Sequence, residues 1–351
     1  MRVLMVGGSN SITKDRYILH FANKLTEEYG EVEILNCSVG ATTSITSLAL
    51  VDLVTVRPDL IVFEFSLNDS GHLNHRPNAY EKKWQMMEMV FDFMGRKFVG
   101  VPVLPLILAS SDFFDMRVPN SVYDAERDFY RFHGMICHDM RFELFEMFRG
   151  SLPEFIYSDK AHFHRGFASS LIGRTLAQAA QRVLSSQKKT NVYSCYANRT
   201  TRLTHAHEIA VRNEISVGRV ANRHLQLDTV EVRSRSSIII DAPAWPVCLY
   251  IASDGNHGNL SLDVDGLRLD VATIHQDCQE GRFVFTSIPL LLNERFMALR
   301  RDGPLQMKLS MQDGGDAWAF DCMEKGPDTG GARRVQLAAI ATLETSSYLP
   351  L

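Results

Sequence analysis

The sequence has little excess charge, few cysteines and no long hydrophobic run. Its formal net charge is −4 over 351 residues, so there is no basic surplus and we do not expect a nucleic-acid partner. No apolar run approaches the roughly 20 residues that a membrane-spanning helix needs, so no membrane span is expected. The six cysteines are widely scattered without a CxxC pair, which predicts reduced thiols and no structural zinc.

Several site signatures are also absent. The first glycines lack the spacing of a dinucleotide fingerprint, and there is no Gly-Lys-Ser/Thr phosphate loop. His72 and His75 lie near Asp69 without a third metal ligand at a fitting spacing, so we expect neither a metal nor another cofactor. A secretory leader is missing as well, because the first strand is predicted from residue 2, and this predicts a cytoplasmic protein.

The hydrophobic pattern divides the chain into two parts. Strands and helices alternate over residues 1–185, which predicts a three-layer α/β/α domain with a flavodoxin-like, doubly wound parallel sheet. Residues 186–192 read as a polar linker. Over residues 193–351 short alternating runs and turn signals predict a β-sandwich of jelly-roll type, an accessory domain that could bind carbohydrate.

The expected elements follow from these patterns. In the first part we expect strands at 2–6, 32–37, 59–65, 101–109 and 154–157, and helices at 14–29, 44–57, 81–96, 123–148 and 167–184. In the second part the first strand is expected at 208–211, with His205 and His207 on one strand face. Trp245, Tyr250 and Trp318 are either core residues or a sugar-stacking platform.

Small polar residues follow four of the predicted strands of the first part. These turns hold Ser9, Gly40, Asn68 with Asp69, and the segment from Asp159 to His162. Because the carboxyl ends of parallel strands meet at one edge of a sheet, we expect these residues to lie together. They supply the parts that acyl transfer by serine requires.

The roles follow from residue type. Ser9 is the candidate nucleophile, His162 the base and Asp159 the carboxylate that orients it, with His164 as a rival base. The backbone N–H groups of Ser9 and Gly40 and the side-chain amide of Asn68 are candidate oxyanion donors. The alternatives are a turn serine that caps a helix at Ser9, backbone geometry at Gly40, and turn stabilisation by Asn68.

With these motifs in family order, residues 1–185 resemble the SGNH hydrolases, also called the GDSL esterase and lipase family. The resemblance rests on Gly7-Gly8-Ser9, Gly40, Ser66-Leu67-Asn68-Asp69, and Asp159 with His162. Gly8 and Ser66 depart from the family's aspartate and glycine at those positions. The resemblance implies a serine esterase with a small acylated substrate, such as an acetyl ester of a saccharide.

Two other functions remain open on the sequence. A sugar hydroxyl could resolve the acyl-enzyme in place of water, which would make the protein an O-acyltransferase in polysaccharide or glycoconjugate assembly. Alternatively, the protein could be a non-catalytic glycan-binding protein that keeps the motif residues for structure.

Overall fold

The computed structural model describes most of the chain as two compact units, 1–195 and 196–351. The described residues are 1–12, 16–186, 199–221, 225–234, 236–253, 258–275, 283–312, 317–320, 323–324 and 334–345. The predicted linker at 186–192 therefore lies almost wholly outside the described residues. Within those residues, no helix is both long enough and apolar enough to cross a bilayer.

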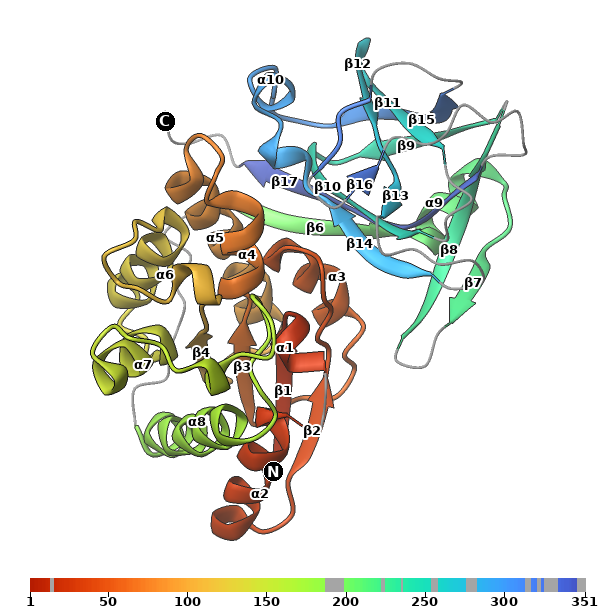
Figure 1. Ribbon diagram of the computed structural model, residues 1–351. Coiled ribbons are helices and arrows are strands. Elements are labelled where there is room, and N and C mark those ends of the chain that lie inside the picture. The colour runs from red at the N-terminus through yellow and green to blue at the C-terminus, as the bar shows by residue number, and fades with distance from the viewer. Residues whose placement is uncertain are drawn as a thin grey trace. The chain divides into compact units, whose positions relative to one another are not determined.

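The first unit is built on a five-stranded parallel sheet (Figure 1). Its strands are β1 (Arg2–Gly7), β2 (Glu33–Asn36), β3 (Leu60–Glu64), β4 (Val103–Ile107) and β5 (His138–Asp139). Their order is β2-β1-β3-β4-β5, which confirms the predicted flavodoxin-like topology. Strands β1, β3 and β4 are almost entirely buried, as expected for a parallel sheet covered on both faces.

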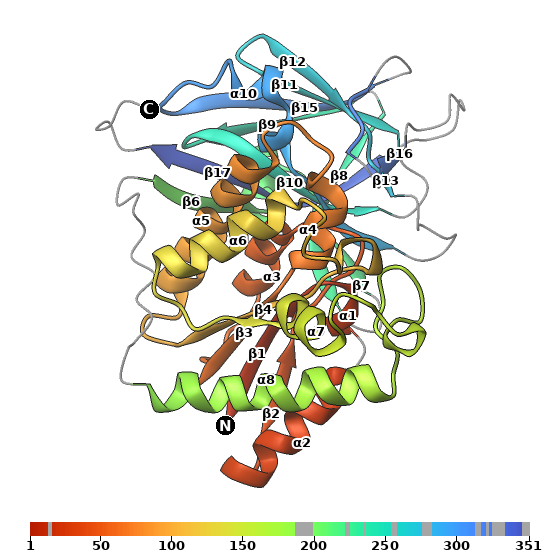
Figure 2. The same cartoon turned by 60° about the vertical axis from the view of Figure 1, so that its left-hand side comes forward.

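Helices cover both faces of this sheet. One face packs against α2 (Tyr17–Tyr29), α7 (Met140–Phe148) and α8 (Phe167–Ser185), and Figure 2 shows α8 crossing it. The helices outside that cluster include α3 (Ser47–Asp52), α5 (Ala79–Lys97) and α6 (Ser121–Phe132). Two short helices begin where strands end, namely α1 (Ser9–Ile12) after β1 and α4 (Ser66–Leu73) after β3.

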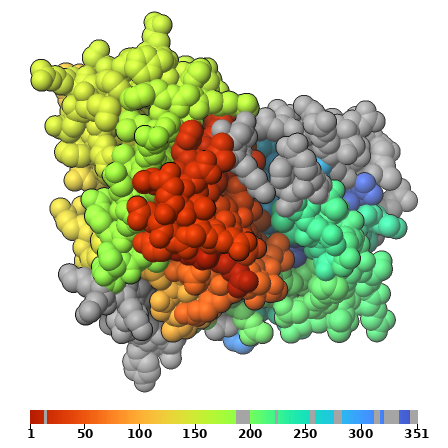
Figure 3. Space-filling view, turned by 90° about the horizontal axis from the view of Figure 1, so that it is seen from below, coloured from red at the N-terminus to blue at the C-terminus, as the bar shows by residue number. Residues whose placement is uncertain are grey.

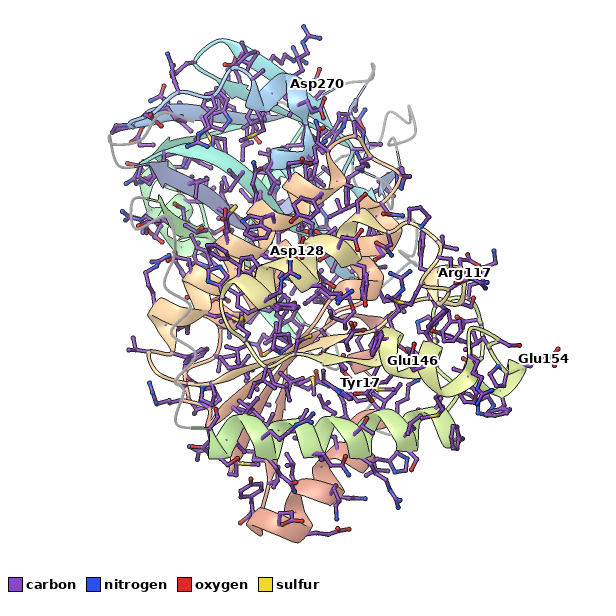
Figure 4. The ribbon with its side chains drawn as sticks, turned by 90° about the vertical axis from the view of Figure 1, so that its left-hand side faces the viewer. Tyr17, Arg117, Asp128, Glu146, Glu154 and Asp270 are labelled. Atoms are coloured by element: carbon purple, nitrogen blue, oxygen red, sulfur yellow. The ribbon has the colours of Figure 1, made fainter. Side chains whose placement is uncertain are left out.

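The sheet has a hydrophobic core on each of its two faces, and alternate residues of each strand point into one core or the other. Val3 and Met5 of β1 belong to the cluster that contains α2 and α8 residues. Tyr17 of α2 belongs to the same cluster and is labelled beside α8 in Figure 4. On the other face, the rings of Phe63 in β3 and Phe91 in α5 lie 5.0 Å apart. The alternation places each helix layer on its own set of side chains.

A glycine lets α8 approach α2 closely. A Cβ at Gly173 would lie 2.4 Å from the carbonyl oxygen of Tyr17 and 2.8 Å from the backbone nitrogen of Phe21. These are backbone atoms that cannot move aside without shifting the helix. The space-filling view shows the N-terminal residues next to the green residues of α8 (Figure 3).

Three expected elements of the first unit were wrong. Residues 154–157 do not form the fifth strand, because Glu154–Ile156 is a 3-10 turn and Tyr157 makes only an isolated bridge with Phe163. The fifth strand is β5, within the expected helix 123–148. That helix is interrupted at Gly134, which adopts a positive φ of 62° that favours glycine. The helix expected to reach residue 57 ends at Asp52.

The second unit consists mainly of antiparallel strands, as expected (Figure 1). One six-stranded sheet contains β6 (Arg199–His205), β7 (Gly218–Ala221), β8 (Gln226–Arg233), β10 (Trp245–Ser253), β14 (Val284–Ile288) and β17 (Arg334–Thr345). A four-stranded sheet contains β9 (Ser237–Ala242), β11 (Asn259–Val264), β12 (Leu267–Val271) and β15 (Leu305–Gln312). The remaining elements are β13 (Ile274–His275), β16 (Met323–Glu324), α9 (Ala206–Asn213) and α10 (Glu294–Met297).

The turn predicted at Asp265-Gly266 is confirmed, whereas the strand predicted at 208–211 was wrong. Asp265 and Gly266 join β11 to β12 with φ values of 50° and 85°, which are typical of a type I′ hairpin. Residues 208–211 form part of α9 and not a strand, because the Glu208 carboxylate accepts the N–H of His205 and caps the helix. His205 and His207 therefore do not share a strand face.

The aromatic side chains proposed for sugar stacking are mostly core residues. Trp245 and Tyr250 are buried, and the Trp245 ring packs 5.0 Å from that of Phe296. Trp318 is only half-buried, and its backbone N–H donates to the carbonyl of Asp270. A stacking platform made of all three rings is thus excluded.

Candidate active site

Ser9 opens helix α1, after Gly7, which ends β1, and Gly8, which joins the two elements. Neither glycine has a positive φ, so both are needed for space and not for a left-handed turn. A Cβ at Gly7 would lie 2.4 Å from Ser11 Oγ, and one at Gly8 would lie 2.1 Å from Asn68 Oδ1. A side chain at either position would therefore overlap an atom of Ser11 or Asn68.

Asp159 and His162 form a hydrogen-bonded pair in the loop before α8. The two Asp159 carboxylate oxygens lie 3.0 and 2.9 Å from His162 Nδ1, and one of them also accepts the N–H groups of Ala161 and His162. Burial alone would raise the pKa of Asp159, but these hydrogen bonds together lower it. With Nδ1–H donating to the carboxylate, Nε2 of His162 is left to accept a proton.

His164, the rival base, has a different environment. Its Nδ1 accepts the N–H of Gly166 at 3.3 Å, and its own backbone N–H donates to Ile156. The ring is therefore held by the start of α8, with no carboxylate bonded to it among the described residues. This geometry favours His162 over His164 as the base.

Asn10 links the Ser9 turn to the loop of His162. Its Nδ2 donates to the carbonyl of Ala161 at 2.9 Å, and its Oδ1 accepts the N–H of Phe163 at 3.1 Å. Asn10 follows Ser9 in the chain, while Ala161 and Phe163 flank His162. Sequence reasoning missed this residue, because an asparagine in a polar turn gives no sign of such a distant partner.

Gly40 lies against Ser9, as the shared sheet edge requires. A Cβ at Gly40 would come within 3.3 Å of Ser9 Cβ and 3.2 Å of Ile12 Cδ1. The next residue, Ala41, has a positive φ of 53° in the region that favours glycine. The turn after β2 thus passes close to Ser9 through a backbone conformation that is sterically unfavourable for alanine.

Asn68 in α4 contacts the other two turns. Its Oδ1 accepts the Ser9 N–H at 3.4 Å, and its Nδ2 donates to the Thr42 carbonyl at 3.1 Å. Since Nδ2 carries two hydrogens, one of them is not used by Thr42. Ser9, Gly40 and Asn68 are thus brought together, although the Ser9 N–H already has a weak acceptor.

A buried carboxyl group lies beneath the Ser9 turn. Glu64, at the end of β3, accepts the Gly8 N–H at 3.2 Å and the Ser11 hydroxyl at 2.7 Å, and the Ser11 hydroxyl also pairs with the Tyr17 hydroxyl. Burial raises the pKa of Glu64 to about 8, against the lowering effect of the hydrogen bonds from Ser11 and Gly8. Glu64 is therefore largely protonated at neutral pH.

A buried ion-pair network lies behind Asn68 and supports the residues around it. Lys83 in α5 pairs with Asp69, the neighbour of Asn68, and its Nζ lies 2.7 Å from Glu126 in α6. Asp69 also accepts the Ser44 N–H at 2.8 Å, so it supports both α4 and the turn after β2. Burial alone would lower the pKa of Lys83, but the charges of Asp69 and Glu126 raise it. No local pattern in the sequence indicates this network.

No metal site appears among the residues that the structure describes, since no three histidine, cysteine or acidic side chains cluster there. Cys37, Cys137 and Cys248 are free, and the other three cysteines lie outside the described residues.

The sequence matches no family model and no curated protein. The fold resembles solved structures at low identity, over about half of this chain and nearly all of the other. An acetyl xylan esterase is 16% identical, with 52% of this chain and 98% of that one covered and a TM-score of 0.41. An alpha/beta hydrolase enzyme from the metagenome of Lake Arreo is 14% identical (53% and 96% covered, TM-score 0.43). A lipase/acylhydrolase from Enterococcus faecalis is 15% identical (52% and 97% covered, TM-score 0.39).

Proposed function

We propose that this protein is a serine esterase that works through an acyl-enzyme, with Ser9 as nucleophile, His162 as base and Asp159 as its partner. The observation that carries the proposal is the pairing of His162 Nδ1 with Asp159 in a loop that Asn10 ties to the Ser9 turn. A nucleophile, a base and an orienting carboxylate at one sheet edge are the parts that acyl transfer by serine needs.

The reaction follows from these roles. Ser9 Oγ attacks the ester carbonyl while its proton passes to His162 Nε2, and Asp159 stabilises the imidazolium that forms. His162 then returns the proton to the leaving alcohol, and the ester bond breaks to give an acyl-Ser9. A water molecule, deprotonated by His162, then attacks the acyl carbonyl. The bond to Ser9 Oγ breaks as His162 returns the proton to that oxygen, and the acid is released.

The oxyanion is proposed to bind between Ser9, Gly40 and Asn68. The Ser9 N–H now donates to the neutral Asn68 Oδ1 over a long 3.4 Å, so a negatively charged oxygen would compete well for it. The second hydrogen of Asn68 Nδ2 and the Gly40 N–H are the other donors of the proposal. Loss of one such donor slows acyl transfer by about 100- to 1,000-fold.

For the substrate we propose a small acyl group, such as acetyl, on a carbohydrate. This substrate class comes from the motif resemblance. At Gly40, which lies against Ser9, the substrate would meet backbone and no side chain.

The test combines labelling and turnover. The wild type is expected to react with a fluorophosphonate probe and to hydrolyse a short-chain aryl ester, whereas Ser9→Ala and His162→Ala should lose both activities. Ser38→Ala, a serine in the neighbouring turn, and His164→Ala are the matched controls and should keep them.

A screen of acetylated sugars then addresses the substrate. Turnover of the acetylated sugars supports the proposed substrate class. Acyl transfer to a sugar hydroxyl in place of water would identify an O-acyltransferase. Absence of labelling together with measurable glycan affinity would contradict catalysis.

A further inference from the structure

The loop of His162 is held both by its own residues and by the segment after β4. There the Ser111 N–H donates to the Lys160 carbonyl at 2.9 Å, and the Tyr157 hydroxyl donates to the Ala109 carbonyl. Asp159 accepts the backbone N–H groups of Ala161 and His162, and the Ser158 N–H donates to the His162 carbonyl at 2.8 Å. Tyr157 and Phe163 close the loop with a bridge. These contacts orient the imidazole and tie its loop to the segment after β4, but none of them joins the loop to the Ser9 turn.

Asn10 provides a direct link between the Ser9 turn and the loop of His162. Its side chain is 1% exposed and its two amide atoms bond the backbone on both sides of His162, at Ala161 O and Phe163 N. The amide nitrogen Nδ2 is the donor in one bond and the amide oxygen Oδ1 is the acceptor in the other, so both ends of the amide group are used. Because Asn10 follows Ser9 on the same short helix, the clamp joins the nucleophile's backbone to the base's backbone.

We infer that Asn10 is a positioning residue that sets the separation of the Ser9 hydroxyl and His162 Nε2. The inference rests on the proposed function, since it assigns Asn10 a part in the same reaction. Proton transfer depends steeply on this separation, and a displacement of about 1 Å can cost about 100-fold in rate. Without the clamp, the loop would keep its internal bonds and its bonds to the segment after β4, but it would lose its direct bonds to the Ser9 turn.

A purely structural role makes a different prediction, and the chain offers a matched control. Asn213 in the second unit makes the same kind of double clamp, because its Nδ2 donates to the Ile239 carbonyl and its Oδ1 accepts the Ile239 N–H, both at 2.7 Å. Removal of this clamp should lower stability without touching the proposed reaction.

The experiment compares Asn10→Ala with Asn213→Ala in the full chain, using a short-chain aryl ester and the rate of fluorophosphonate labelling. Asn10→Ala is expected to lower kcat and the labelling rate by about 10- to 100-fold, with KM changed less than about threefold. Asn213→Ala should leave kcat within twofold of the wild type. A kcat for Asn10→Ala that stays within twofold, while Ser9→Ala abolishes turnover, would overturn the inference and leave the proposed function intact.

A second variant keeps the test decisive if Asn10→Ala fails to fold. Asn10→Asp keeps the shape and the acceptor for Phe163 N–H but replaces the donor to Ala161 with an oxygen. A kcat about tenfold lower supports the clamp, and an unchanged kcat contradicts it. A wild type that neither labels nor turns over would instead refute the proposed function.

Discussion

Because the Glu64 carboxyl is buried, we expect it to make the stability of the protein depend on pH. The substitution Glu64→Gln should remove this part of the pH dependence. Glu64 is fully buried, and its Oε2 accepts the Gly8 N–H and the Ser11 hydroxyl. Its other oxygen, Oε1, has no hydrogen-bond partner among the described residues. A charge at this oxygen would be costly, which is the physical reason why the group keeps its proton.

The size of the effect follows from the pKa. Burial raises the pKa of Glu64 from 4.5 to about 8, so between these values the native state holds a proton that the unfolded chain has lost. Stability must therefore fall as the pH rises through this window and level off above it. At about 1.4 kcal/mol per pH unit, the whole window corresponds to about 5 kcal/mol at most.

Glu64→Gln replaces the protonated acid with a neutral group of similar shape. The difference in free energy of unfolding, variant minus wild type, should grow by several kcal/mol from pH 5 to pH 8, with an upper limit of about 4 kcal/mol over these three pH units. Urea unfolding of both proteins at pH 5, 6, 7, 8 and 9 measures it. Glu126, whose pKa burial raises to about 7, adds a similar slope to both proteins and cancels in the difference.

The control for Glu64 is Glu33→Gln, an exposed carboxylate on β2 that pairs with Arg2. This variant should shift stability by less than about 1 kcal/mol at every pH, because exposed ion pairs contribute little. A Glu64→Gln difference that stays constant within about 1 kcal/mol from pH 5 to 9 would show that Glu64 is ionised in the fold, and the reasoning would be refuted.

Three further substitutions have defined outcomes. Gly173→Ala should destabilise the first unit by about 1–3 kcal/mol in urea unfolding, because its Cβ meets the Tyr17 carbonyl, and an unchanged midpoint would contradict the packing. Asp159→Asn should lower kcat by about 100- to 10,000-fold, because the His162 ring loses the carboxylate that holds its tautomer; a loss under fivefold would argue against the pair. Gly40→Ala should lower kcat/KM by about tenfold at an unchanged melting temperature, since its Cβ crowds the substrate's approach to the reacting serine; full activity would argue against that location.

The parts of the fold that the sequence predicted are those with a local signal. The apolar run of β1 before a glycine pair, the alternation of β9 and the Asp265-Gly266 turn can each be read from neighbouring residues. The Asp159–His162 pair is similarly local, since three residues separate the two side chains. Strand β5 was missed because two residues give no periodic pattern, and α9 because its capping bond outweighs a short alternation.

The sequence by itself determined the alternation of strands and helices in the first part, the predominance of strands in the second part and the residue types at each turn. Only the tertiary structure decided which atoms lie in contact and which side chains are buried. It shows the hydrogen bonds from Asn10 to the loop of His162, the lack of room for a side chain at Gly8, and the burial of Glu64 and Lys83. The physical reason is the distance along the chain over which each interaction acts. Propensity, capping and periodicity act within a few residues, whereas hydrogen-bond partners and the exclusion of water depend on segments that lie farther apart in the chain. The separation is 53 residues for Glu64 with Ser11 and 151 residues for Asn10 with Ala161.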